Sequence, residues 1–297
     1  MRSSTFLSVV AGGFLAQLAS ASALGRRQAS NTTACATSVH MIVARASTEM
    51  PGQGIIGAVA TKVQNAMSGS DSEAVVYPAT LTDYQASEAS GVAAMTKLIE
   101  EYTARCPDTK IALMGYSQGA QVVGDVLCGT SQANFNTTKP IAEKYQKNIV
   151  AVIQMGDPSH MPNFPQDVGN ATKAGIFPRP DTAACKNLEP MTKAYCNADD
   201  RFCDSGNSVP VHLAYVQNFG TQAADFVMKM VMGNSTMSTG TGSGTATTSS
   251  GSTPKGSGSP SATATAKPTT NGGAERAGVN SAAAWIAALV LGVILYL

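Results

Sequence analysis

Residues 110–127 read KIALMGYSQGAQVVGDVL. The first five residues are mostly aliphatic and predict a short buried strand. The last ten residues, which begin at Gln118, predict a helix. Between them, two glycines surround Ser117 in a G-x-S-x-G pattern, and glycine permits the tight strand-to-helix turn that this pattern requires. The stretch therefore predicts a strand, a sharp turn with the serine at its tip, and a helix.

This setting makes Ser117 a candidate nucleophile. On such a turn the hydroxyl projects above the sheet, and the N-terminus of the following helix points positive charge at a developing oxyanion. The backbone N–H of Gln118 is then a candidate oxyanion donor. A serine hydroxyl is a poor nucleophile unless a neighbouring base takes its proton. The chain must therefore also supply a histidine and a group that orients it.

Three further apolar runs predict buried strands, and three further helical patterns alternate with them. This alternation implies a mostly parallel sheet covered by helices on both faces, which is a three-layer α/β/α sandwich. The predicted strands are 38–43, 73–77 and 148–155, and the predicted helices are 55–68, 85–106 and 212–232.

The composition excludes several classes of function. Charged residues make up 13% of the 297 residues and the formal net charge is +1, so nucleic acid is not an expected partner and a weakly charged substrate is favoured. The six cysteines form no C-x-x-C pair, and no glycine-rich phosphate loop is present. We therefore expect neither a metal nor a cofactor, and instead expect three disulfides formed in an oxidising compartment.

The N-terminus has the features of a secretory signal peptide. An apolar stretch leads to Ala21-Ser22-Ala23, which has the small-residue form of a cleavage site, so residues 1–23 are expected to be removed. A dibasic pair, Arg26-Arg27, offers a second cut that would start the mature domain at residue 28. Passage through the secretory pathway is consistent with four N-glycosylation sequons, at Asn31, Asn136, Asn170 and Asn234.

The C-terminus has the composition of a stalk followed by an anchor signal. Residues 233–270 are almost entirely Ser, Thr, Gly, Ala and Pro, which cannot bury enough apolar area to fold. Residues 271–297 begin with small residues at Asn271 and continue into a polar spacer and an apolar tail, the order of a GPI-anchor signal. The alternative is a transmembrane helix, but the tail is shorter than the roughly 20 residues needed to span a bilayer. We expect a secreted protein that is anchored at the cell surface or cell wall.

Three histidines are candidates for the base that activates Ser117. His40 lies inside a predicted strand, where a core histidine is expected. His160 and His212 both follow the serine, and the order Ser, Asp, His that accompanies this motif allows either.

A short loop supplies the candidate acid. Cys196 and Cys203 bracket NADDRF, and a bridge that closed this loop would hold a carboxylate rigidly and contribute about 2 to 3 kcal/mol in the chain-entropy model. His212 follows soon after this loop, which favours it as the base. Either Asp199 or Asp200 could orient it, and the other would be a solvated charge.

Four segments resemble the signature blocks of fungal cutinases and acetylxylan esterases, in the same order: ARASTE (44–49), GYSQG (115–119), CNADDRFC (196–203) and HLAY (212–215). Together they span the middle domain, residues 28–232. The resemblance implies the small α/β-hydrolase fold of that family and a serine esterase without metal or cofactor. It also implies the disulfides Cys35–Cys106 and Cys196–Cys203, which leaves Cys128 and Cys185 to pair.

The resemblance also implies roles for individual residues. The acid that orients the base corresponds to Asp200 rather than Asp199, and His212 becomes the general base. Ser47, in the first block, corresponds to a second oxyanion contact beside that of Gln118. Losing one such donor typically lowers turnover by a factor on the order of 10² to 10³.

Substrate choice depends on the surroundings of these residues. Residues 204–208 (DSGNS) lead toward His212 and are polar, whereas a site for waxy acyl chains would have bulky aliphatic groups there. We therefore favour an acetylxylan esterase that removes acetyl groups from polysaccharide. A cutinase that acts on longer-chain polyester is the alternative, and a non-catalytic wall-anchored scaffold or adhesin is a third. We expect a monomer that is attached to the membrane through its lipid anchor.

Overall fold

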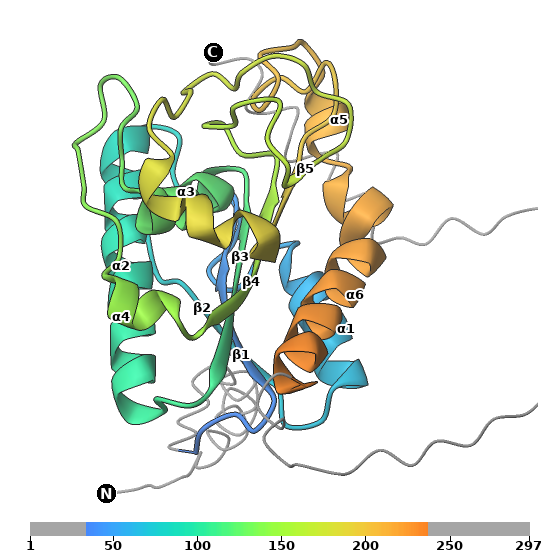
Figure 1. The fold of residues 1–297 in the computed structure, drawn as a ribbon. Coiled ribbons are helices and arrows are strands. Elements are labelled where there is room, and N and C mark those ends of the chain that lie inside the picture. Colours follow the sequence, from blue (N-terminus) through green and yellow to red (C-terminus); the bar gives the residue numbers. More distant parts are fainter. Residues whose placement is uncertain (1–33, 237–297) are drawn as a thin grey trace, which may run out of the picture. The chain divides into compact units, whose positions relative to one another are not determined.

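The computed structural model describes residues 34–236, in which strands and helices alternate around one sheet (Figure 1). Several predicted features lie outside the described residues: the signal peptide at 1–23, the sequon at Asn31, the stalk beyond residue 236 and the anchor signal that begins at Asn271. The side chain of Asn234 is not described either.

A six-stranded sheet in the order β2-β1-β3-β4-β6-β5 forms the centre of the fold, and every strand pairing in it is parallel. The central strands are almost wholly buried, as expected of parallel strands with helices on both faces. Because all strands run the same way, their carboxyl ends meet at one edge, where Ser117 lies. The strands are β1 (Val39–Ala44), β2 (Asp71–Ala74), β3 (Lys110–Tyr116), β4 (Ile149–Met155), β5 (Asp167–Val168) and β6 (Thr192–Tyr195).

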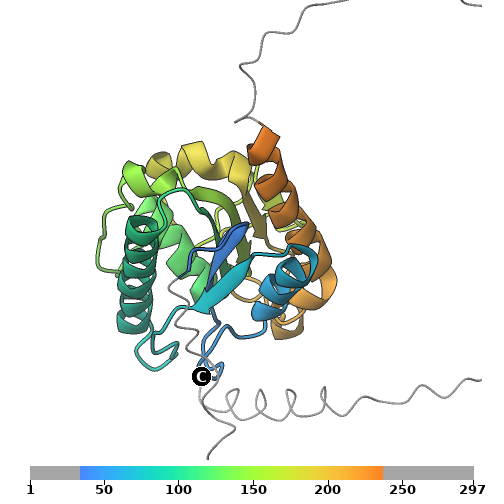
Figure 2. The same ribbon diagram turned by 90° about the horizontal axis from the view of Figure 1, so that it is seen from below.

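Helices cover both faces of the sheet, which confirms the predicted α/β/α sandwich (Figure 2). Alternate residues of β1 and β3 contribute to the two cores, so that Met41 of β1 packs with α1 and α6, whereas Ile42 packs with α2 and α3. The helices of the first face are α1 (Gly57–Ala66) and α6 (Tyr215–Thr236). Those of the second face are α2 (Tyr84–Arg105), α3 (Gln118–Cys128) and the 3-10 helix η1 (Ala183–Met191).

Two short helices, α4 (Glu143–Gln146) and α5 (Val209–His212), complete the described elements. The helix predicted over 212–232 is in fact divided, because α5 ends at His212 and α6 begins at Tyr215. Strand β2 lies at 71–74 rather than at 73–77, since polar residues of this edge strand pair with β1 while their side chains stay half-buried. The sequence did not predict β5, β6 or η1, because these elements are short and lack a periodic apolar pattern.

Three disulfides join the six cysteines as the resemblance implied: Cys35–Cys106, Cys128–Cys185 and Cys196–Cys203. The first fixes the start of β1 to the end of α2, and the third closes the loop that contains Asp200. Within residues 34–236, none of the helices combines the length and the apolar character that crossing a bilayer requires.

Candidate active site

Ser117 occupies the turn between β3 and α3 with a left-handed backbone, at φ 53° and ψ −120°. Such a conformation costs a residue other than glycine on the order of 1–3 kcal/mol. Tertiary contacts hold it in place, because the N–H of Ser117 donates to the Met155 carbonyl oxygen at 2.8 Å. The strand, sharp turn and helix expected around the serine are therefore present.

Close backbone contacts require the two glycines of the motif. A Cβ at Gly115 would lie 2.2 Å from the carbonyl oxygen of Gly119. A Cβ at Gly119 would lie 2.2 Å from the carbonyl oxygen of Ala44, at the end of β1. A larger residue at either position would push α3 away from the sheet and move the serine.

His212 lies between Ser117 and Asp200. Its Nε2 is 2.9 Å from Ser117 Oγ, and its Nδ1 is 2.9 Å from Asp200 Oδ2. A carboxylate can only accept, so Nδ1 carries a proton that it donates to Asp200. In the neutral ring this leaves Nε2 free to accept the proton of the serine hydroxyl. Ser117, which is 95 residues from His212 in the sequence, thus joins His212 and Asp200 in one connected relay.

Asp200 is fully buried inside the loop that the Cys196–Cys203 disulfide closes. Its Oδ1 accepts from the N–H of Phe202 at 2.7 Å and of Cys203 at 2.9 Å. Burial alone would raise the pKa of this carboxyl, but the hydrogen bond and charge of His212 and the two backbone N–H groups together lower the pKa below its usual value. Asp199, the other candidate acid, is exposed and does not contact the imidazole.

The other two histidines lie away from the serine and have partners of their own. The Nδ1 of His160 is 3.1 Å from the Cys203 carbonyl oxygen, and its Nε2 is 3.6 Å from Asp167 Oδ1. His40 is buried in β1, between two carboxylates of the edge strand β2. It is thus a core histidine with satisfied ring nitrogens, as predicted, and the histidine that contacts Ser117 is His212.

The structure brings the loop after β1 next to the start of α3, where the oxyanion donors are expected. Ser47 lies in this loop, and its Oγ is buried without a hydrogen-bond partner in the described part of the chain. Gln118 is the first residue of α3, so its N–H has no acceptor within the helix. A buried hydroxyl and a helix N-terminal N–H beside a nucleophile are the donors that an oxyanion needs.

Both donors are held by polar contacts of neighbouring side chains. Glu49 fixes the Ser47 loop, because its carboxylate accepts from the N–H of Ala46 at 2.7 Å and of Ile55 at 2.8 Å. The Gln118 side chain is fully buried and accepts from the Ser87 hydroxyl of α2 at 3.0 Å. These contacts leave little freedom for the groups that would face an oxyanion.

Sequence reasoning missed three residues that support the relay. Gly156 follows β4 at φ 64°, and a Cβ there would lie 2.7 Å from Cε1 of His212. Tyr215 donates its hydroxyl to Asp200 Oδ2 at 2.8 Å, and Tyr116 donates its hydroxyl to the carbonyl oxygen of His212. Both tyrosines lie inside the recognised blocks GYSQG and HLAY, which was the available signal for them.

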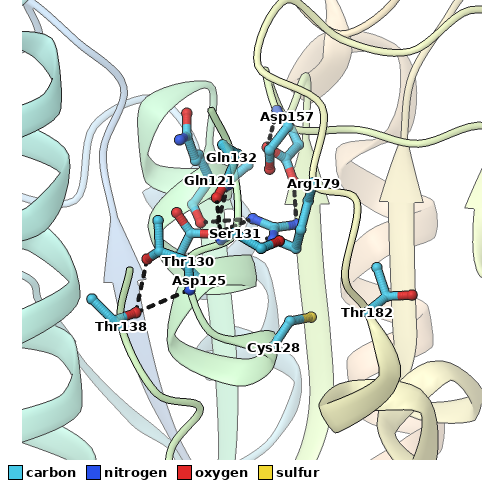
Figure 3. A network of polar contacts seen from close by, with 12 residues as sticks. Gln121, Asp125, Cys128, Thr130, Ser131, Gln132, Thr138, Asp157, Arg179 and Thr182 are labelled. Carbon is cyan, nitrogen blue, oxygen red and sulfur yellow. Dashed lines mark hydrogen bonds and ion pairs between the residues drawn. The ribbon is translucent and has the colours of Figure 1, made fainter. Parts of the chain in front are cut away.

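A buried network of charged side chains holds α3 in place (Figure 3). Arg179 donates from Nε and Nη2 to Asp125 Oδ1 at 3.0 and 2.7 Å, and from Nη2 to the Gln121 carbonyl oxygen at 3.3 Å. Its Nη1 lies 3.6 Å from Asp157 Oδ2, in the loop after β4. The network thus connects α3, which begins directly after Ser117, to the loop after β4, in which Gly156 lies against the imidazole of His212.

The polar segment 204–208, which had suggested a short acyl group, uses its side chains for another purpose. Asp204 is buried and accepts from the N–H groups of Asp199, Thr172 and Lys173. Ser208 caps α5 by accepting from a backbone N–H. These two side chains hold turns in place, so their polarity has a structural explanation, and the short acyl group inferred from the segment stays a prediction.

Apolar side chains, by contrast, are exposed beside the relay. Leu213 follows His212 and is 42% exposed. Ile176, which is 41% exposed, donates its N–H to the carbonyl oxygen of Phe202 at 2.9 Å. The centroid of the Phe202 ring lies 4.5 Å from that of the His212 ring. Within residues 34–236, no group of three or more histidine, cysteine or acidic side chains is arranged to hold a metal ion.

The cutinase family model matches residues 35–231. Cutinase 11 of Verticillium dahliae is 34% identical over 213 residues, which cover 68% of this chain and 72% of that protein. Acetylxylan esterase 2 of Talaromyces purpureogenus is 33% identical over 199 residues, which cover 64% of this chain and 85% of that protein. The solved catalytic core domain of acetyl xylan esterase from Trichoderma reesei aligns with a TM-score of 0.61 at 34% identity, covering 65% of this chain and 98% of that one.

Proposed function

Since this chain belongs to the cutinase family and is a carboxylic ester hydrolase, we propose that Ser117, His212 and Asp200 are its catalytic triad and that it removes short acyl groups from polysaccharide. The observation that carries the proposal is the connected relay, in which both links of His212 measure 2.9 Å. A non-catalytic scaffold has no need of all three groups in this arrangement.

The reaction proceeds through an acyl-enzyme. Ser117 Oγ attacks the ester carbonyl carbon while His212 Nε2 takes the hydroxyl proton, and the carbonyl oxygen becomes an oxyanion that faces Ser47 and the N–H of Gln118. His212 then gives the proton to the leaving alcohol, and the carbon–oxygen bond to that alcohol breaks. Water, activated by His212 in the same way, cleaves the acyl-serine ester and releases the carboxylic acid.

Asp200 supports both proton transfers. Its lowered pKa keeps the carboxyl ionised at neutral pH, so a negative charge faces the imidazole when that ring becomes protonated. Its hydrogen bond also fixes the tautomer with Nδ1 protonated, which is the tautomer that leaves Nε2 available to the serine. Asp200 itself stays ionised throughout.

Replacing Ser117 tests the triad. Ser117→Ala should abolish hydrolysis of p-nitrophenyl acetate and labelling by a fluorophosphonate probe while the protein stays folded. Ser90→Ala, at an exposed position on α2, is the matched control and should keep both. Turnover by the Ser117→Ala protein above the spontaneous rate would refute the assignment. A wild-type protein that is neither active nor labelled would favour the scaffold or adhesin.

The length of the acyl group separates the two enzymatic candidates. The likeness to acetylxylan esterases, which extends over 98% of the solved catalytic core domain, supports a short acyl group. The exposed Leu213 and Ile176 beside the relay favour a longer chain, so a cutinase that acts on polyester is the second candidate. We expect kcat/KM to fall from p-nitrophenyl acetate through butyrate to octanoate. A rate that climbs along this series would establish the cutinase instead.

We also propose that the enzyme is a secreted monomer anchored at the cell surface. Ala36 and Met232, close to the two ends of the described residues, line one cavity together with Lys110, the first residue of β3. Ser117 follows the opposite end of β3. A tether attached after residue 236 would therefore start on the side opposite the active site and leave that site open to a polymer.

Enzymatic release tests the anchor. A phospholipase C specific for phosphatidylinositol should free the esterase from intact cells, whereas retention in the membrane would support the transmembrane alternative.

Asn136 and Asn170 are both exposed, as glycosylation requires. Treatment of the secreted protein with an N-glycanase should therefore reduce its mass, and an unchanged mass would show that these sequons are unused.

A further inference from the structure

The hydroxyl of Tyr215 contacts both the candidate catalytic acid and the loop that carries it. It donates to Asp200 Oδ2 at 2.8 Å and accepts from the N–H of Asn197 at 2.8 Å. It also lies 3.3 Å from Cys203 Sγ, at the other end of the disulfide loop. Tyr215 is fully buried and is the first residue of α6, three positions after His212. One hydroxyl therefore joins α6, both ends of the loop and the acid.

The hydrogen bonds of Asp200 show what this hydroxyl adds. Oδ1 accepts from two backbone N–H groups of its own loop and lies 3.1 Å from His212 Nδ1. Oδ2, the oxygen closer to the imidazole, has two partners, which are His212 Nδ1 and the Tyr215 hydroxyl. Without the tyrosine, His212 would be the remaining partner of Oδ2, and the carboxylate would otherwise be fixed only through the two backbone N–H groups on Oδ1.

We propose that Tyr215 is a positioning residue for ester hydrolysis, whose hydroxyl holds Asp200 Oδ2 in line with His212 Nδ1 and takes up part of the negative charge of the carboxylate. The inference rests on the proposed triad. Tyr215 is buried behind Asp200 and acts through it, so its loss should affect kcat rather than KM. A hydrogen bond to a charged group is strong enough for its loss to be measured in a rate.

Tyr195 offers a matched control. It is fully buried, and its ring packs against Phe219, as the ring of Tyr215 does. Its hydroxyl, unlike that of Tyr215, has no hydrogen-bond partner in the described part of the chain. Tyr195→Phe thus removes the same atom from the same core without breaking a contact to the acid.

The test compares Tyr215→Phe with Tyr195→Phe in the hydrolysis of p-nitrophenyl acetate. Tyr215→Phe should lower kcat about tenfold with KM unchanged. It should also move the acid limb of the kcat/KM profile to higher pH, since more negative charge then remains on Asp200 to stabilise the protonated ring. Tyr195→Phe should leave both unchanged. Rates per site labelled by a fluorophosphonate probe separate a loss of turnover from a loss of folded protein.

A double-mutant cycle tests the route through the acid. In the Asp200→Asn background, Tyr215→Phe should cause no further loss, because the charge through which it acts is gone. Equal losses in both backgrounds would overturn the route through Asp200. Identical kcat and pH profiles for Tyr215→Phe and Tyr195→Phe would overturn the positioning role itself. An inactive wild type or an active Ser117→Ala protein would instead refute the triad, so the two failures are distinguishable.

Discussion

Glu88→Gln removes a titrating proton from the buried network that holds α3. Glu88 lies on α2 and is buried, and its carboxyl interacts with that of Asp125 on α3. Two carboxyl groups can share a hydrogen bond only when one of them is protonated. Burial, followed by the hydrogen bond and charge of Asp125 and the charge of Asp157, raises the pKa of Glu88 to about 9, although Arg179 opposes this. Glu88 is therefore the protonated partner at neutral pH.

Proton linkage gives the sign and the size of the effect. The unfolded chain loses the Glu88 proton near the ordinary pKa of 4.5, whereas the folded protein keeps it up to a pKa of about 9. Between these values the unfolded state binds fewer protons, so the free energy of unfolding falls by about 1.4 kcal/mol for each pH unit. Over the whole interval this contribution amounts to about 6 kcal/mol as an upper bound. Glutamine does not titrate, and its amide can still donate to Asp125.

The free energy of unfolding in urea, measured across this pH interval for wild type and Glu88→Gln, checks the reasoning. The difference in favour of the variant should grow as the pH rises and level off near the raised pKa. Glu100→Gln, at an exposed position on the same helix, is the matched control and should give a constant difference. If the Glu88→Gln difference were equally constant, Glu88 would be ionised in the folded protein and the shared proton would not exist.

Three further predictions concern the relay and the edge of the sheet. Ser47→Ala should lower kcat on p-nitrophenyl acetate by a factor on the order of 10² with little change in KM, and an unchanged kcat would remove Ser47 from the oxyanion site. Gly156→Ala should lower both kcat and Tm, because the new Cβ would lie 2.7 Å from the His212 ring at a positive φ, whereas normal kinetics would show that the ring has room. Burial lowers the pKa of His40, but its contacts with Asp71 and Glu73 raise the pKa above 6.5 on balance. The stability that these contacts contribute is therefore complete below pH 6.5 and is lost as the pH rises through the raised pKa. His40→Gln should therefore flatten the alkaline side of the Tm–pH curve, and a parallel curve would contradict this.

Local pattern was sufficient to predict the centre of the fold. Strands β1, β3 and β4 are buried apolar runs, and β3 leads directly into the glycine-flanked serine. The G-x-S-x-G spacing predicts a turn because glycine alone tolerates the backbone contacts found at Gly115 and Gly119. These features depend on residues that are close in sequence, so a single sequence contains the information.

The break between α5 and α6 could not be predicted in this way. The sequence predicts a helix over 212–232, and no glycine or proline marks residues 213–214, which separate α5 from α6. Yet the break places His212 at the end of one helix, facing Ser117, and Tyr215 at the start of the next, facing Asp200. Tertiary hydrogen bonds from Tyr116 and Tyr215 stabilise this geometry. Local helix propensity does not predict such contacts.

The polar loop at 204–208 shows why composition alone is ambiguous near a site. A polar side chain in a loop has two possible partners, the substrate and the backbone of its own turns, and composition does not distinguish them. In this loop Asp204 and Ser208 are occupied by backbone N–H groups. We expect acyl preference to depend instead on exposed apolar side chains, such as Leu213 and Ile176. Polar substitutions at these two positions should change the dependence of kcat/KM on acyl length, whereas substitutions at 204–208 should act through stability.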